Sequence, residues 1–296
     1  MSEKIINLLY CLDSNYDIQA LVSLNSFLKN YDQSVNIHFI HENSETLKVH
    51  ESHILKNKNI NEIHFYDFSP SDQQFVKLFP INEEMKHITM ATYFRLFLNN
   101  YLKNDIKNLL YLDPDVVVIK NITTALNEKF DELDLSKFTI GATNYIISDN
   151  KENRDFLKQL HMTSHSYFNA GVLLIDYEKW RNHNLSQKLL DSVGEVAEII
   201  KFNDQDILNS HFDGQFLEIG FDYNYPIKEN LFFKNKINIE KSVYLVHYQG
   251  SEKPWSVTGL FNNSSIYYQN FYNFSNSSKY HIVFDPKDKL VKVLKK

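Results

Sequence analysis

Apolar runs alternate with amphipathic stretches along the first hundred residues. Nearly continuous apolar residues predict strands at 5–12, 35–40 and 63–68. Between them, apolar residues at helical spacing predict a helix that begins after residues 13–15 and another at 45–57. Alternation of this kind pairs strands in parallel through right-handed crossovers. The N-terminal part is therefore expected to form a Rossmann-like half.

The same patterning continues, less regularly, through the rest of the chain. Further strands are expected at 109–112, 116–119, 138–142, 170–176 and 243–248, and further helices at 87–98, 185–200 and 204–212. Residues 69–80 follow neither period and are expected to be irregular. Residues 262–280 are rich in Asn, Ser and aromatic side chains, which predicts a surface segment or a short helix outside the sheet. The overall prediction is an α/β protein with a mixed sheet flanked by helices.

Two carboxylates stand between two strand-like runs in the sequence of residues 109–118. Pro114 separates Asp113 from Asp115, and its fixed φ predicts a turn at the carboxyl end of a strand, where open α/β sheets bind ligands. Acids this close repel unless a cation lies between them, and Mg²⁺ or Mn²⁺ suits such oxygen ligands. Taken alone, a polar turn is the better explanation of Asp-x-Asp, which is a common pattern and recurs at residues 204–206.

Composition narrows the classes of function. The chain has 296 residues, of which 43% are hydrophobic and 23% charged, as in an ordinary soluble globular protein. The formal net charge of −6 argues against a nucleic-acid binder. Cys11 is the single cysteine, which excludes disulfides and cysteine-based zinc sites within one chain. With no signal peptide or 18-residue apolar run, we expect a cytoplasmic protein.

Two further groups of residues follow predicted strands. Asp13 and Asn15 come after the first strand, where an acid and an amide can contact the edge of a base, although capping of the next helix explains them equally well. His247 ends the last strand, and an imidazole suits Mn²⁺ beside carboxylates. Gly250 and Lys253 follow it, offering close backbone approach and a charge for phosphate. Most histidines, however, are structural.

Three other features have both a structural and a functional interpretation. Asn169, Ala170 and Gly171 precede a buried strand, where small residues let a sugar ring lie against the backbone or simply allow a tight strand entry. Arg95 stands on an otherwise apolar helix and needs a partner, which is most often a structural ion pair. Asp204 opens a predicted helix, where an acid also favours the helix dipole.

Six segments in this order resemble family eight of the retaining glycosyltransferases, the group that includes bacterial lipopolysaccharide galactosyl- and glucosyltransferases and glycogenin. They cover residues 5–255 and read LYCLDSNY, HITMATYFRL, LYLDPDVVV, YFNAGVLLID, FNDQDILN and HYQGSEKPW. The resemblance implies a GT-A fold, a UDP-sugar donor and Mn²⁺, with Mg²⁺ as a substitute. It implies a catalytic domain at 1–258, with a nucleotide-binding half at about 1–120 and an acceptor half at about 121–258. Residues 259–296 would form a small C-terminal appendage.

The resemblance also implies roles for particular residues. The metal ligands it implies are Asp113, Asp115 and His247. The donor contacts it implies are Asp13 and Asn15 at the uridine, His87 and Arg95 along the donor site, Asn169, Ala170 and Gly171 at the sugar, and Gly250 and Lys253 at the phosphates. The catalytic residues it implies are Asp204, which would bind sugar hydroxyls, and Gln205, near the anomeric carbon.

These assignments predict a retaining hexosyltransferase that moves glucose or galactose from UDP to a hydroxyl of a glycan. Because Gln205 stands where a carboxylate nucleophile would be expected, front-face substitution is favoured over a covalent intermediate through Gln205 or Asp204. The chief alternative is a non-catalytic sugar- or UDP-binding partner of another transferase. A nucleotidyltransferase is disfavoured, because no basic phosphate loop follows the first strand.

The donor sugar and the acceptor stay open at this level. Glucose and galactose differ in one hydroxyl orientation, and the acceptor can be a lipid-linked glycan, a polysaccharide or a glycoprotein glycan. The tail from Lys287 is basic and mildly amphipathic, which suits contact with the inner face of a membrane. A solvated terminus is the simpler interpretation of so short a tail.

Overall fold

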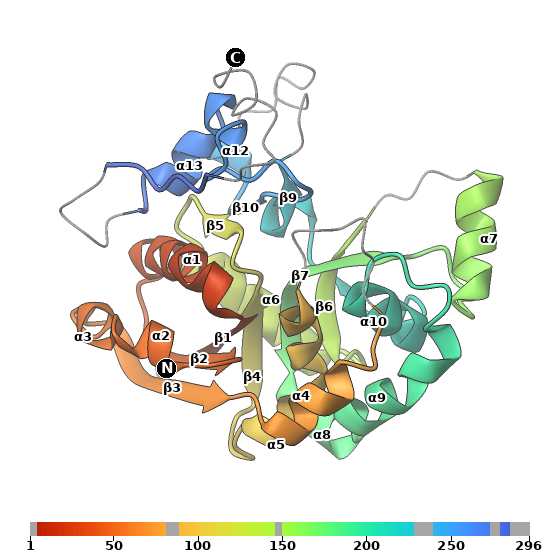
Figure 1. Cartoon of the computed structure of the whole chain (residues 1–296). Helices are drawn as coiled ribbons and strands as arrows, with labels where there is room; N and C mark the ends of the chain where they lie inside the picture. Colours follow the sequence, from red (N-terminus) through yellow and green to blue (C-terminus); the bar gives the residue numbers. More distant parts are fainter. Residues whose placement is uncertain (1–4, 81–88, 146–149, 228–238, 273–278, 285–296) are drawn as a thin grey trace.

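The computed structural model describes residues 5–80, 89–145, 150–227, 239–272 and 279–284. Its centre is a seven-stranded mixed sheet in the order β3-β2-β1-β4-β7-β6-β8, beside a small sheet in the order β5-β10-β9 (Figure 1). The strands are β1 Ile6–Leu12, β2 Val35–His41, β3 Ile60–Asp67, β4 Asn108–Leu112, β5 Val116–Val118, β6 Ile140–Asn144, β7 Phe168–Asp176, β8 Leu217–Glu218, β9 Tyr225–Pro226 and β10 Leu245–His247. The predicted α/β class and mixed sheet are confirmed.

The four strands β3, β2, β1 and β4 are parallel, as the alternation of strands and helices predicts. β7 then runs antiparallel to both β4 and β6. As a result, the carboxyl ends of β1 and β4 meet the amino-terminal end of β7 at one edge of the sheet. The polar residues that follow β1 and β4, and those that begin β7, are thereby gathered in one place.

Both faces of the main sheet are buried, which explains the continuous apolar runs in its strands. Alternate residues of β4 enter different cores: Leu109 and Tyr111 pack on one side, and Leu110 and Leu112 on the other. The first core is closed by η2 and helices α7 to α10, and the second by α1 and α6.

The helical segments are η1 Ser14–Tyr16, α1 Asp17–Asn30, α2 Glu45–Lys48, α3 Glu51–Ile54, α4 Pro70–Val76, η2 Met90–Phe97, α5 Leu98–Tyr101, α6 Thr123–Leu135, α7 Lys151–Gln159, α8 Tyr177–Asn182, α9 Leu185–Val196, α10 Asp204–Phe212, η3 Phe221–Tyr223, α12 Ile239–Ser242, η4 Gly259–Phe261 and α13 Ser265–Gln269.

Three local predictions need correction. The region 69–80 is not wholly irregular, because α4 begins at Pro70 after the Ser69 side chain accepts a hydrogen bond from the Asp72 backbone N–H. The single helix expected at 45–57 is two short ones, α2 and α3. The described part of the helix expected at 87–98 is largely the 3₁₀ helix η2, continued by α5.

The small sheet places β10, from the C-terminal third of the chain, beside β5, which follows the Asp113–Asp115 turn. β10 pairs antiparallel with β5 in a register that sets His247 opposite Val116, the residue after Asp115. Trp255 and Tyr268 pack into the core of this sheet. Tyr268 belongs to α13, so the short helix in the segment 262–280 is packed against the small sheet. The basic tail from Lys287 lies outside the described residues. Among the described residues, no helix has both the length and the apolar character needed to cross a membrane.

Acid is expected to weaken this fold through His38. The side chain is 1% exposed, lies 3.1 Å from Asn7 Oδ1, and burial lowers its pKa from 6.5 to about 3. Below pH 6.5 the unfolded chain therefore takes up a proton that the folded chain does not. His38 alone should account for a loss of about 2–3 kcal/mol in the free energy of unfolding between pH 7.5 and 4.5. Urea unfolding of wild type and His38→Gln at both pH values measures this contribution. An unchanged pH slope in the variant would contradict it.

Candidate active site

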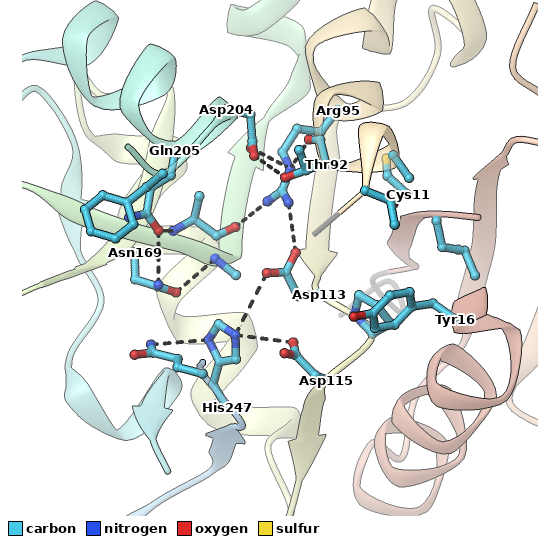
Figure 2. A pocket seen from close by; sticks show the side chains of 18 of the residues that line it. Cys11, Tyr16, Thr92, Arg95, Asp113, Asp115, Asn169, Asp204, Gln205 and His247 are labelled. Carbon is cyan, nitrogen blue, oxygen red and sulfur yellow. Dashed lines mark hydrogen bonds and ion pairs between the residues drawn. The ribbon is translucent and has the colours of Figure 1, made fainter. Parts of the chain in front are cut away.

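A cavity of about 480 Å³ lies at the edge where β1, β4 and β7 bring their polar residues together. All but two of the predicted site residues line it, and Figure 2 shows most of the central ones pointing toward one another. These lining residues are Asp13, Arg95, Asp113, Asp115, Asn169, Ala170, Gly171, Asp204, Gln205, His247, Gly250 and Lys253. Asn15 is exposed and outside the lining, and its backbone N–H donates to Asp13 Oδ1 at 2.9 Å. His87 lies outside the described residues.

Two side chains donate hydrogen bonds to one of the two carboxylate oxygens of Asp113. Its Oδ1 accepts hydrogen bonds from the Tyr111 hydroxyl at 2.6 Å and from Arg95 Nη2 at 2.9 Å. Its backbone N–H donates to the Gly171 carbonyl at 2.8 Å, which ties the turn to β7. The second oxygen, Oδ2, lies 3.9 Å from His247 Nε2. One oxygen of Asp113 thus fixes the side chain and the other faces the imidazole.

Asp115 is almost completely buried, and its two oxygens have different surroundings. Oδ2 pairs with Lys253 Nζ at 2.5 Å, and the same ammonium donates to the Tyr248 carbonyl at 2.7 Å. Oδ1 has no hydrogen-bond partner within the described structure and lies 3.3 Å from His247 Nε2. Burial acts to raise the pKa of Asp115, but Lys253 and His247 together hold the pKa well below its usual value. The carboxylate is therefore kept charged inside the protein.

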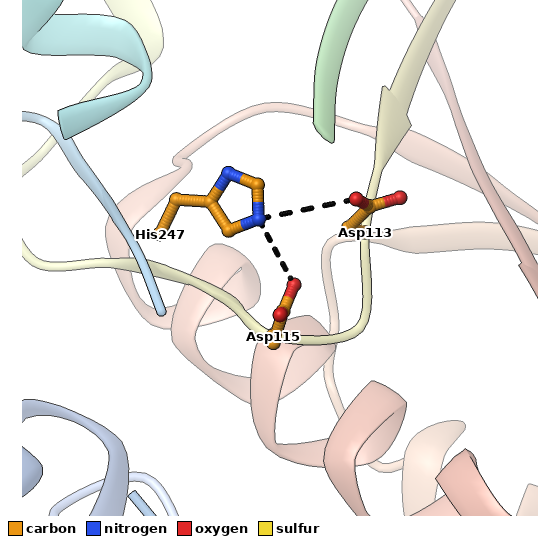
Figure 3. Close-up of side chains that lie close together, drawn as sticks. All are labelled: Asp113, Asp115 and His247. Atoms are coloured by element: carbon orange, nitrogen blue, oxygen red, sulfur yellow. Dashed lines mark ion pairs between the residues drawn. The ribbon is translucent and has the colours of Figure 1, made fainter. Parts of the chain in front are cut away.

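Asp113, Asp115 and His247 form a triad of side chains able to hold a cation (Figure 3). One ligand atom from each lies within 4.8 Å of the others. Two carboxylate oxygens and one imidazole nitrogen are a donor set that suits Mn²⁺ or Mg²⁺. The buried Asp115 Oδ1, which lacks a hydrogen bond within the described residues, is the kind of atom that a cation would satisfy. The donor set therefore fits a divalent metal.

Arg95 links the triad to Asp204. The residue is 5% exposed, and its guanidinium pairs with Asp204 Oδ2 at 3.0 Å and donates to the Ala170 carbonyl at 2.6 Å. Thr92 donates a hydrogen bond to the other oxygen of Asp204. Burial raises the pKa of Asp204 to about 6, although the charge of Arg95 opposes this shift. Both oxygens of Asp204 are thus engaged by side chains of the protein.

Gln205 is fixed in one orientation beside the cavity. Its Oε1 accepts from the Ala170 backbone N–H at 3.0 Å and from Asn169 Nδ2 at 3.1 Å. Its Nε2 donates to the Tyr167 hydroxyl at 3.0 Å. Because a backbone N–H can only donate, the oxygen and nitrogen of this amide cannot exchange places without losing contacts.

The sequence did not single out several residues that complete this site. Tyr111 was detectable, because strand alternation puts it on the same side of the chain as Asp113 two residues later. Thr92 lies three residues before Arg95 and partners the same carboxylate. Asn224 is 2% exposed and contacts His247, yet nothing local in the sequence marks it. Besides Tyr111, the Tyr and Phe side chains that line the cavity are Tyr16, Tyr145 and Phe202.

Comparison with known proteins identifies the family of this chain. The model of glycosyl transferase family 8 matches residues 7–259. The chain belongs to this family. As a family 8 protein it is a glycosyltransferase, an enzyme that transfers a sugar.

Relatives of this family 8 enzyme align over most of its length. It is 28% identical over 282 residues to the lipopolysaccharide 1,2-glucosyltransferase of Escherichia coli strain K12, covering 90% of this chain and 77% of the relative. It is 25% identical over 276 residues to the lipopolysaccharide 1,3-galactosyltransferase of Salmonella typhimurium, covering 89% and 77%. The galactosyltransferase LgtC, solved with donor and acceptor sugar analogues, matches with a TM-score of 0.71 at 23% identity, covering 93% of this chain and 97% of LgtC. The expected GT-A fold is confirmed.

Proposed function

We propose that this family 8 enzyme is a Mn²⁺-dependent retaining hexosyltransferase that moves glucose or galactose from a UDP-sugar to a hydroxyl of a glycan. The observation that carries the proposal is the triad of Asp113, Asp115 and His247 at the cavity, with a buried Asp115 oxygen aimed at His247 Nε2. When bound, the metal would supply Lewis-acid stabilisation of the charge on the departing diphosphate. Mg²⁺ is the substitute expected from the same donor set.

Lys253 supports this proposal as a positive charge beside the proposed metal site. The residue is 7% exposed and its ammonium contacts Asp115, so the charge is held close to the triad. A charge in that position stabilises negative charge on a diphosphate leaving group. Gly250 precedes it with a φ of +83°, a backbone conformation that favours glycine, and nothing occupies the space where a side chain would stand. The loop from Gly250 to Lys253 thus has room beside the diphosphate.

The surroundings of Asp204 and Gln205 support front-face substitution. Asp204 is buried, with Oδ2 ion-paired to Arg95 and Oδ1 hydrogen-bonded to Thr92, and both contacts lower its nucleophilicity. Gln205 carries an amide, a poor nucleophile, and its contacts to Asn169 and Ala170 fix it beside the proposed sugar site. We assign Gln205 to positioning near the anomeric carbon and Asp204 to ordering the sugar side of the cavity. The leaving phosphate itself would accept the proton of the acceptor hydroxyl.

The uridine would lie toward β1, where Asp13 and Tyr16 line the cavity. Asp13 Oδ1 accepts the Asn15 backbone N–H, so capping and ligand contact can coexist at this carboxylate. A contact between Asn15 or His87 and the donor stays a prediction from the sequence, as do the glycan acceptor, the cytoplasmic location and the contact of the basic tail with the inner membrane face.

Calorimetric titration of UDP, first in Mn²⁺ and then in EDTA, tests whether nucleotide binding depends on the metal. Binding of UDP in Mn²⁺ that disappears in EDTA is the expected result, and binding that is equal in both would contradict the metal site. The alternative function, a non-catalytic UDP- or sugar-binding partner, would bind UDP but never turn over a UDP-sugar. Transfer assays with lipid-linked, polysaccharide and glycoprotein glycans therefore separate the two.

Gly171→Ala is expected to damage the metal site without removing a ligand. A Cβ at this position would lie 2.2 Å from His247 Cε1 and 3.0 Å from Asp113 Oδ2, so the imidazole would have to move. We expect Mn²⁺ to bind about 10- to 100-fold more weakly, the scale found when the support of a metal ligand is disturbed. Gly194→Ala, which meets no neighbouring atom within 4 Å, is the matched control. Equal Mn²⁺ affinity in the two variants would contradict the placement of His247.

A further inference from the structure

The two ring nitrogens of His247 face different partners. Nε2 is directed at Asp115 Oδ1, at 3.3 Å, and at Asp113 Oδ2, at 3.9 Å. Nδ1 lies 2.9 Å from the side-chain oxygen of Asn224, which begins the approach to β9. A neutral imidazole carries its proton on one nitrogen only, and a metal binds the other. The partner of Nδ1 therefore determines whether Nε2 is free to be a ligand.

The backbone N–H of Gly171 determines which end of the Asn224 amide faces His247, by way of Asn169. The Gly171 N–H donates to Asn169 at 3.0 Å, which identifies the accepting atom of Asn169 as Oδ1. Asn224 approaches the same oxygen at 2.8 Å, so the atom it presents there must be its donor, Nδ2. Its oxygen is then the atom that faces His247 Nδ1. An amide oxygen only accepts, and so Nδ1 carries the proton.

A second backbone group gives the same orientation to the neighbouring amides. The Ala170 N–H donates to Gln205 Oε1, and Asn169 Nδ2 donates to that oxygen as well. Gln205 Nε2 donates in turn to Tyr167, whose hydroxyl donates to Asp206 Oδ1 at 2.5 Å. Each side chain therefore points its donor away from His247. The metal triad and Gln205 belong to one hydrogen-bonded network with a single direction.

The opposite tautomer of His247 has a partner of its own. With its proton on Nε2, the ring would turn an N–H toward the buried Asp115 Oδ1 at 3.3 Å, a contact that is an ion pair and not a hydrogen bond in this structure. That proton would stand where a metal must bind. Gln249 is also near Nδ1, but at 3.5 Å its amide is farther than a normal hydrogen bond. Asn224 is thus the contact that opposes the unproductive tautomer.

We propose that Asn224 is a positioning residue that holds His247 in the Nδ1–H tautomer and so keeps Nε2 free for the metal. The proposal rests on the proposed function, in that it takes Nε2 as a metal ligand. Asn224 never contacts the substrate in this account. It acts on the reaction only through His247 and, by way of Asn169, through the network that fixes Gln205.

Mn²⁺ binding followed by electron paramagnetic resonance of the free ion tests this role without an activity assay. Asn224→Ala is expected to raise the Mn²⁺ dissociation constant about 10- to 100-fold. Asn7→Ala is the matched control, because Asn7 is also a buried, multiply hydrogen-bonded amide but lies at the opposite end of β1. It should lower thermal stability and leave the Mn²⁺ affinity unchanged. Equal affinity in wild type and Asn224→Ala would overturn the inference, whereas no Mn²⁺ binding in wild type would overturn the proposed function itself.

Nitrogen chemical shifts of ¹⁵N-labelled histidine read the tautomer directly in metal-free protein. In wild type at pH 8.5, we expect the His247 signal, identified by its loss in His247→Gln, to show a protonated Nδ1 and an unprotonated Nε2. Asn224→Ala should shift the signal toward the Nε2–H form. Tyr167→Phe, which breaks the network beyond the Ala170 N–H, should leave the tautomer unchanged. A wild-type signal from the Nε2–H form would overturn the inference whatever the metal affinity.

Discussion

Asp115→Ala is expected to lower Mn²⁺-dependent sugar transfer about a thousandfold. The substitution removes one of the three proposed ligands and the buried charge that the triad presents to a cation. It also leaves the ammonium of the buried Lys253 without its carboxylate partner. Losing the electrostatic stabilisation of a leaving group costs on the order of a hundred- to a thousandfold in rate, and loss of the metal adds to it. Steady-state rates across a Mn²⁺ titration measure the effect.

Two companion variants make this result specific to the triad. Asp191→Ala removes an exposed carboxylate on α9 and should transfer sugar at the wild-type rate. Asp115→Asn keeps the shape of the side chain but not its charge, and should be nearly as inactive as Asp115→Ala. Because an unpaired buried lysine destabilises the fold, rates are compared well below each unfolding temperature. A tenth or more of wild-type activity in Asp115→Ala would remove Asp115 from the metal site.

Arg95→Ala is expected to produce the largest loss of stability. Arg95 is buried between Asp113 and Asp204, with its guanidinium 4.0 Å from the centre of the Tyr111 ring. Removing the arginine leaves two carboxylates without their shared cation, and breaking a buried pair in this way costs about 3–5 kcal/mol. Arg95→Lys should restore little, because a lysine cannot reproduce several directed contacts at once. Urea unfolding gives the free energies.

A double mutant tests whether the loss arises from stranded charge. In Arg95→Ala the pKa of Asp204, already raised to about 6 by burial, should rise further once its cation is gone. Adding Asp204→Asn removes that charge and should recover part of the lost stability, about 1–3 kcal/mol. Strictly additive losses in the double mutant would show that the two side chains do not interact.

Elements that are buried on both faces were predictable from the sequence. The strands β1, β4 and β7 consist of apolar residues whose ends are marked by polar ones, so their positions follow from local pattern. The segment at 69–80 contains a helix because Ser69 and Pro70 begin it, a capping signal that the apolar pattern does not contain. In η2, tertiary packing of the aromatic residues prevails over the regular helix that the apolar spacing predicts.

The site residues also differ in how far local sequence predicts them. Asp113 and Asp115 stand out because both lie in one short turn whose chemistry is visible locally. The approach of His247 to Asp115 depends on the antiparallel register of β10 against β5, which no short stretch of sequence contains. Asn224 is harder still to predict, because its role arises only from contacts with Asn169 and His247.

Release of UDP from a panel of UDP-sugars, measured without acceptor in Mn²⁺ and then in EDTA, tests the central claim most directly. The account predicts slow hydrolysis of one UDP-hexose, which also identifies the donor, and its loss both on chelation and in Asp115→Ala. UDP release that proceeds equally in EDTA, or that persists in Asp115→Ala, would contradict the claim that Asp113, Asp115 and His247 hold a metal required for sugar transfer.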